Sequence, residues 1–169
     1  MALPWLQVAS LGREVVGMRK GESMKKRLTP DTEGNTLIVM VGPPGCGKTT
    51  LANSLSPIFE TMVVSSDAVR MRLFGSEEIQ TGNEKVFETV YSEIERYGLQ
   101  NLDVIYDATN CNKRYRKELV ERFGNLFDHI LAFRYDGTLD ACLDRNSKRS
   151  RVVPNHVIRR MYADIQGDN

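Results

Sequence analysis

LIVMVGPPGCGKTT, residues 37–50, joins an apolar run of strand length to a glycine-rich segment that ends in a lysine and two threonines. The glycine-rich part fits the pattern G-x-x-x-x-G-K-[ST] over residues 42–49. A P-loop requires a buried strand before this pattern and a helix after it, and the sequence here has an apolar run before it and an expected helix after it. We therefore predict a P-loop.

Each residue type in this segment has a physical role. The glycines allow backbone conformations in which successive N–H groups point into one concavity, where they bind phosphate together with the helix dipole. Lys48 is placed to reach the β- and γ-phosphates of ATP, and the Thr49 hydroxyl is placed to bind Mg²⁺. We therefore predict ATP and Mg²⁺ as cofactors, Lys48 as a catalytic residue and Thr49 as a metal ligand. The predicted cofactor-binding residues of this loop are Gly42, Pro43, Pro44, Gly45, Cys46, Gly47, Lys48, Thr49 and Thr50.

From Thr36 onward, apolar runs alternate with segments of helical periodicity. This alternation predicts an α/β three-layer sandwich around a mainly parallel sheet of about four strands. Residues 1–34 end in turn-forming residues and are predicted to be an N-terminal extension, with a short amphipathic helix as one interpretation of its apolar start. Residues 35–169 are predicted to be the P-loop domain.

The expected elements follow from periodicity and from helix boundary signals. The expected strands are residues 37–41, 61–65, 103–107 and 129–135. The expected helices are residues 48–56 (ended by Pro57), 67–75 (with Asp67 as the N-cap), 84–99, 113–123, 139–147 and a last one that Pro154 begins.

Composition narrows the class of protein. At 169 residues and 41% hydrophobic content, the chain has the size of one domain. Cys46, Cys111 and Cys142 lack metal-ligand spacing, so they predict neither a zinc site nor a disulfide framework. Without an apolar run of membrane-span length or a signal-peptide pattern, we expect a cytoplasmic protein that does not contact membranes.

The net charge of +1 gives no global attraction to nucleic acid, but basic residues gather in two segments. Residues 144–160 hold six basic residues against one acid, and residues 13–27 hold six against two. These clusters are suited to binding the backbone of a single strand. Ordinary solvated surfaces are the alternative.

Charged residues are expected at the sheet edge that carries the P-loop. Asp67 is placed to accept the proton of an attacking hydroxyl, or it is only a helix N-cap. Arg70 lies on the same helical face and is suited to an anionic group of the acceptor, or it is an ordinary surface arginine. Asp107 ends the third strand and either acts on Mg²⁺ or begins a structural turn through Thr109 and Asn110 that steadies the P-loop.

The segment RNSKRSR, residues 145–151, connects two expected helices and is a candidate lid. Phosphoryl transfer spreads negative charge over the transferring group, and an arginine supplied by the same chain is a common way to neutralise that charge. A solvated basic loop is the alternative interpretation.

In these motifs the chain resembles the phage-type polynucleotide 5′-kinases, within the wider group of small P-loop kinases that includes zeta toxins. The resemblance rests on GPPGCGKTT, SSDAVR, VIYDATN, and RNSKR with the VP and MY that follow it, and it spans Leu37 to about Ile165. It implies a P-loop kinase-like fold with a short lid.

The resemblance also implies a reaction, which is transfer of the ATP γ-phosphate to the 5′-OH end of DNA or RNA in nucleic-acid end healing. Asp67 would be the general base, and Arg70 would contact the phosphate on the 3′ side of the terminal nucleotide. Arg145 and Arg149 would bind the ATP phosphates from the lid, with Arg149 as a catalytic residue. The implied substrate-binding residues are Asp67, Arg70, Asp107, Thr109 and Asn110.

Two alternatives stay open beside this interpretation. One is a zeta-toxin-like kinase of a small molecule or nucleotide-sugar, and the other is a P-loop module that binds nucleotide without turnover. Fuller members of the polynucleotide kinase family carry a phosphatase motif, D-x-D-x-T, that is not in this sequence. A separate phosphatase or ligase partner, a homo-oligomer and the choice between DNA and RNA are all left open.

Overall fold

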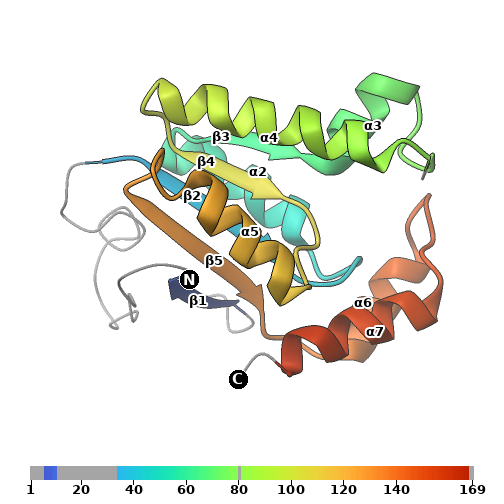
Figure 1. Cartoon of the computed structure of the whole chain (residues 1–169). Helices are drawn as coiled ribbons and strands as arrows, with labels where there is room; N and C mark the ends of the chain where they lie inside the picture. Colours follow the sequence, from blue (N-terminus) through green and yellow to red (C-terminus); the bar gives the residue numbers. More distant parts are fainter. Residues whose placement is uncertain (1–5, 11–33, 80, 168–169) are drawn as a thin grey trace.

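The computed structural model of the chain describes residues 6–10, 34–79 and 81–167. Five strands form one sheet in the order β1-β5-β2-β4-β3 (Figure 1). Strands β2 to β5 are mutually parallel, and β1 is antiparallel to β5. This arrangement confirms the expected α/β fold with four parallel strands. The strands are β1 (Leu6–Ser10), β2 (Thr36–Val41), β3 (Met62–Ser65), β4 (Val104–Asp107) and β5 (His129–Tyr135).

Six helices accompany the sheet in the described part of the chain. Helix α2 follows the P-loop, and α6 and α7 form a hairpin beyond the end of β5 (Figure 1). Among the described residues, no helix has both the length and the apolar character of a membrane span. The helices are α2 (Lys48–Phe59), α3 (Ser66–Phe74), α4 (Asn83–Leu99), α5 (Lys113–Phe123), α6 (Leu139–Ser147) and α7 (Asn155–Gln166).

The central strand β2 is buried along its whole length, and its side chains point alternately to the two faces of the sheet. Leu37 and Val39 pack in the cluster that contains the buried residues of α4 and α5. Ile38 and Met40 pack in the cluster that contains the buried residues of α2. This alternation follows from the two-residue period of a strand, and helices packed on both faces give three layers. Because the strands β2 to β5 are parallel, their carboxyl ends lie at one edge of the sheet.

Helix α2 is longer than the sequence predicted, because Pro57 lies inside it instead of ending it. A proline inside a helix removes one N–H donor, but only two more residues follow before the helix ends at Phe59. The end is closed by Glu60, whose φ is 54° and whose N–H donates to the Ser56 carbonyl. A single lost bond in a last turn is thus tolerated.

The N-terminal extension contributes a strand, so the helix considered for its apolar start is wrong for residues 6–10. Strand β1 pairs with β5 from Leu6 opposite Tyr135 to Ser10 opposite Leu131. Without this partner, β5 would be an edge strand with a row of unpaired backbone groups, and β1 satisfies them. The basic cluster of residues 13–27 lies outside the described residues.

Candidate active site at the carboxyl edge of the sheet

The predicted P-loop connects β2 to α2 at the carboxyl edge of the sheet. Gly45 and Gly47 have φ values of 81° and 97°, in the left-handed region that other residues rarely adopt. The N–H of Gly42 donates to the Thr109 carbonyl at 2.9 Å, which ties the loop to the segment after β4. The local geometry is therefore that of an anion-binding loop at a helix N-terminus.

Gly45 also brings the P-loop into close contact with α6. A Cβ atom on this residue would lie 2.4 Å from the carbonyl oxygen of Cys142 and 3.0 Å from the backbone nitrogen of Asn146. These distances are too short for any side chain, so glycine is required here for packing as well as for its φ value. The helix that precedes the lid is thus seated directly on the phosphate-binding loop.

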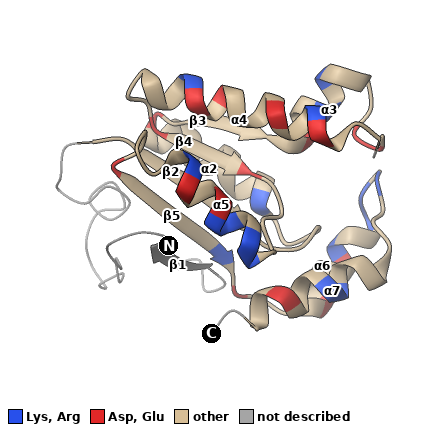
Figure 2. Cartoon of the chain, viewed as in Figure 1, with Lys and Arg blue, Asp and Glu red and all other residues tan. Residues whose placement is uncertain are grey.

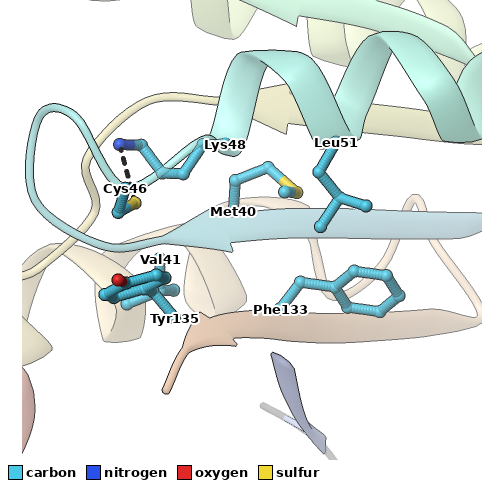
Figure 3. Close-up of a pocket in the computed structure, with 7 residues that line it drawn as sticks. All are labelled: Met40, Val41, Cys46, Lys48, Leu51, Phe133 and Tyr135. Atoms are coloured by element: carbon cyan, nitrogen blue, oxygen red, sulfur yellow. Dashed lines mark hydrogen bonds between the residues drawn. The ribbon is translucent and has the colours of Figure 1, made fainter. Parts of the chain in front are cut away.

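Lys48 is one of the residues that line a small hollow near this loop (Figure 3). Its Nζ donates to the Pro43 carbonyl at 2.9 Å and lies 3.6 Å from the Cys46 sulfur. An ammonium group carries three donors, so it retains capacity to bind a phosphate oxygen. The hollow is lined by Met40, Val41, Cys46, Lys48, Leu51, Phe133 and Tyr135.

Thr49 and Asp107 meet at the start of α2. The Thr49 hydroxyl donates to Asp107 Oδ2 at 2.7 Å, and Asp107 is only 4% exposed. A hydroxyl and a carboxylate oxygen are hard ligands of the kind that Mg²⁺ prefers. The two side chains therefore fit a Mg²⁺ site beside the phosphate-binding loop.

The turn after β4 braces the P-loop, as the structural interpretation of this segment predicted. Asn110 is buried with a φ of 44°, and its Nδ2 donates to the Met40 carbonyl at 2.9 Å. The buried Arg116 donates to the Asn110 carbonyl at 2.7 Å and to the Cys111 carbonyl at 2.8 Å. The Asn110 amide, predicted to bind substrate, thus faces the end of β2, and the Thr109 carbonyl accepts from the loop.

Asp67 is not the N-cap of α3, as the sequence had suggested, but the second residue of that helix. Ser65 is the cap, because its side chain accepts from the N–H of Ala68 at 3.5 Å. The carboxylate of Asp67 is therefore free of capping. Its negative charge in the first helical turn is still favoured by the helix dipole.

Two arginines hold Asp67 by one of its oxygens. Oδ1 accepts from Arg70 Nη1 at 3.1 Å and from Arg151 Nη1 at 3.3 Å. No hydrogen bond from a described residue reaches Oδ2, and the side chain is 39% exposed. One oxygen is thus anchored while the other is open to an incoming hydroxyl.

Arg70 lies on the same helical face as Asp67, as predicted, but it is not an ordinary surface arginine. Its side chain is 7% exposed, and its Nη2 donates to Asn83 Oδ1 at 2.7 Å. Sequence reasoning missed Asn83, which follows the connection between α3 and α4. No local pattern marks a contact that this connection brings together.

Arg151 is the residue of the candidate lid that reaches Asp67, and sequence reasoning gave it no individual role. It belongs to the connection between α6 and α7, where basic residues gather across from α3 (Figure 2). Arg149, predicted to be catalytic, is partly buried and makes no ion pair with another described residue. Its guanidinium is consequently available to a phosphate.

The other predicted lid residue, Arg145, is exposed and interacts with the Tyr135 hydroxyl. Burial and, to a smaller extent, the Cys142 thiol raise the pKa of Tyr135 to about 12, although Arg145 opposes the shift. Burial likewise raises the pKa of the Cys111 thiol to about 12 and that of the Cys142 thiol above its usual range. These thiols are protonated packing groups, not nucleophiles.

Comparison with known proteins agrees with this geometry. A family model described as an AAA domain matches residues 37–167, and the chain belongs to this family. Solved structures of kinases share this fold.

Two solved structures illustrate the range of this fold. A chain in the structure of the Pnkp1/Rnl/Hen1 RNA repair complex is 22% identical with a TM-score of 0.73, and the match covers 82% of this chain and 46% of that one. A gluconokinase from Sinorhizobium meliloti 1021 is 14% identical with a TM-score of 0.54, and that match covers 79% of this chain and 77% of the gluconokinase. This chain therefore spans less than half of the RNA repair chain that it matches.

Proposed function

We propose that this protein is an ATP-dependent polynucleotide 5′-hydroxyl kinase, which transfers the γ-phosphate of ATP to the 5′-OH end of DNA or RNA. The observation that carries the proposal is how the two carboxylate oxygens of Asp67 are bonded. Two arginines fix one carboxylate oxygen and leave the other open, at the same sheet edge as a complete P-loop. A module that only binds nucleotide has no use for such a carboxylate.

The donor side of the reaction belongs to the P-loop. Its backbone N–H groups and Lys48 bind the phosphates of ATP. Thr49 and Asp107 would hold Mg²⁺. When bound, the ion supplies positive charge that neutralises the phosphate oxygens. The Gly45 contact with α6 keeps this loop rigid, so little reorganisation is needed on binding.

The acceptor side belongs to α3. The oxygen of the 5′-hydroxyl attacks the γ-phosphorus of ATP, and Oδ2 of Asp67 accepts the proton of that hydroxyl. The bond between the γ-phosphorus and the β–γ bridging oxygen breaks, and ADP leaves. Arg70 and Arg151 keep the carboxylate aimed during this step. Arg149 and Arg145 stabilise the charge that spreads over the transferring phosphoryl group.

A nucleic-acid acceptor is supported by the charge of the lid. Arg151 reaches Asp67 from the connection between α6 and α7, and residues 144–160 hold six basic residues. Phosphate contacts of such residues dominate the binding of single strands or frayed ends. The similarity to a chain of an RNA repair complex supports the same acceptor class. It also supports a separate partner that carries out the other steps of end healing.

A second candidate is a kinase of a small polyhydroxylated molecule or nucleotide-sugar. The match to a gluconokinase favours it, because that match covers more than three quarters of both chains. Such an acceptor would also present a hydroxyl to Asp67 and an anionic group to the arginines. The two candidates differ only in what the lid encloses.

One transfer assay separates these candidates. Purified protein with labelled ATP and Mg²⁺ is offered 5′-OH DNA and RNA oligonucleotides, a nucleotide-sugar and gluconate in parallel. We expect label on the oligonucleotides, with little on the small molecules. Label confined to gluconate or the nucleotide-sugar would overturn the polynucleotide assignment, and ATP binding without transfer to any acceptor would overturn the kinase assignment.

A further inference from the structure

A chain of polar contacts connects the start of α4 to the candidate base. Asn83 is the first residue of α4, and its Oδ1 accepts a hydrogen bond from Arg70 Nη2 at 2.7 Å. On its other terminal nitrogen, Arg70 forms the 3.1 Å ion pair with Asp67. Because a guanidinium is planar, partners on two different nitrogens fix its orientation.

The side chain of Asn83 is not used to cap its own helix. The cap position is Gly82, which has a φ of 77° and offers no side chain to the helix N-terminus. Asparagine at a helix start commonly caps backbone N–H groups, but this one accepts from Arg70 instead. Its oxygen therefore serves the arginine of the acceptor site.

The charge balance around Arg70 is unusual for a buried arginine. Arg70 and Arg151 share a single carboxylate oxygen of Asp67, so two positive charges face one negative charge. Asn83 is neutral and adds no compensation. In addition, Arg70 Nε is buried with no acceptor in the described part of the chain. Buried charges are normally paired, so this site retains positive charge for an anionic ligand.

We propose that Asn83 is a positioning residue that fixes Arg70, and through it Asp67, without neutralising the guanidinium. The amide of Asn83 orients Arg70 as a carboxylate would, but it does not compensate the positive charge of Arg70. That charge attracts an acceptor that carries a phosphate or carboxylate next to the reacting hydroxyl. This inference rests on the proposed phosphotransferase function and defines the acceptor class of the same site.

Two substitutions in the full chain separate geometry from charge. Asn83→Ala removes the hydrogen-bond acceptor and releases Arg70, so kcat should fall by roughly ten- to a hundredfold, as expected for a lost bond to a charged group. Asn83→Asp keeps an acceptor oxygen but adds a negative charge. Its kcat should stay near that of the wild type, while the KM for a 5′-OH oligonucleotide rises by roughly tenfold.

A neutral acceptor identifies the charge effect. The wild type should prefer an oligonucleotide with a normal first phosphodiester over one whose first linkage is an uncharged methylphosphonate, and Asn83→Asp should lose most of that preference. The dissociation constant of ATP should be the same in all variants, because the P-loop is untouched. Asn155→Ala, which changes the exposed first residue of α7, is the matched control and should behave as the wild type.

Either of two results would overturn this proposal: a kcat of Asn83→Ala equal to that of Asn155→Ala, or a kcat of Asn83→Asp as low as that of Asn83→Ala. Thermal unfolding of each variant shows whether it is folded, and Asn83→Asp carries the kcat and KM test if Asn83→Ala is not. If the wild type transfers phosphate only to gluconate, the polynucleotide assignment fails. The same variants compared on gluconate then still test the role of Asn83.

Discussion

Asp67 combines two properties that a general base needs, a fixed direction and an open oxygen. The direction comes from Arg70 and Arg151, which both bind Oδ1, and the opening comes from the exposure of the side chain. The short distances from Oδ1 to the two arginines suit Asp67 to accept a proton on Oδ2. An acid that only capped α3 would have turned its oxygens toward the backbone N–H groups, a position that Ser65 takes here.

Asp67→Asn tests this role directly. The amide keeps the shape of the side chain but is a poor proton acceptor, so phosphoryl transfer should fall by about 10²–10⁴-fold. ATP affinity, measured by titration calorimetry, should not change. The matched control is Asp140→Asn, because Asp140 is the second residue of α6, as Asp67 is of α3, and is exposed. Equal loss of transfer in both variants would contradict a specific role for Asp67.

At the scale of elements, the site depends on how the P-loop, α6 and the ends of the strands fit together. Gly45 is the point where the loop touches α6, and Asp103 is the point where the starts of β2 and β4 are joined. Neither residue contacts the candidate acceptor site. Both control the position of elements that carry the residues of the reaction.

Gly45→Ala should separate the loop from α6. The new Cβ would meet the Cys142 carbonyl at 2.4 Å in addition to the cost of a φ of 81°. Gly75→Ala is the matched control, since its φ is 72° but no atom lies within 4 Å of the added carbon. We expect Gly45→Ala to lose about 1–3 kcal/mol more unfolding free energy than the control and to lose ATP binding. Equal losses in thermal and denaturant unfolding would show that the contact with α6 is unimportant.

Replacing Asp103 with asparagine should stabilise the protein by an amount that depends on pH. Burial raises the pKa of its carboxyl group, against the opposing effects of the Thr36 N–H and His129. A pKa that is higher in the folded than in the unfolded state means that stability falls as the pH rises through the folded pKa. Asp103→Asn keeps the acceptor for Thr36 without the charge. Its melting temperature should exceed that of the wild type at pH 7, and the difference should shrink as the pH approaches about 4. A constant difference across this range would refute the explanation.

At the scale of the whole molecule, the sheet is completed by a strand that precedes the P-loop domain. Strand β1 covers β5, which is otherwise an edge strand. We propose that residues 35–169 form the kinase domain and that residues 1–34 are an extension attached through this pairing. The candidate site lies among residues 42–151 and uses no residue of β1.

Val8→Pro tests this division. Proline cannot donate to the β5 ladder and should detach β1, with a loss of about 1–3 kcal/mol of stability. ATP binding should be retained, because the P-loop lies on β2. Light scattering should show concentration-dependent association through the exposed edge of β5. Loss of ATP binding in a folded variant would instead make the extension part of the nucleotide site.

The sequence by itself determined the P-loop and several elements to the residue, because these depend on local spacing. Lys113–Phe123, His129–Tyr135 and Leu139–Ser147 have the predicted bounds, and the predicted glycine-rich loop lies between the end of β2 at Val41 and the start of α2 at Lys48. Helical periodicity, strand runs and glycine positions act over a few residues, so they can be read without the fold.

Only the tertiary structure decided the partners of the candidate base. Arg70 meets Asn83 across the connection between α3 and α4, and Arg151 meets Asp67 from 84 residues away. The pairing of β1 with β5 joins segments still further apart. Such contacts are set by how the helices and strands pack in three dimensions, and no local preference of the backbone encodes them.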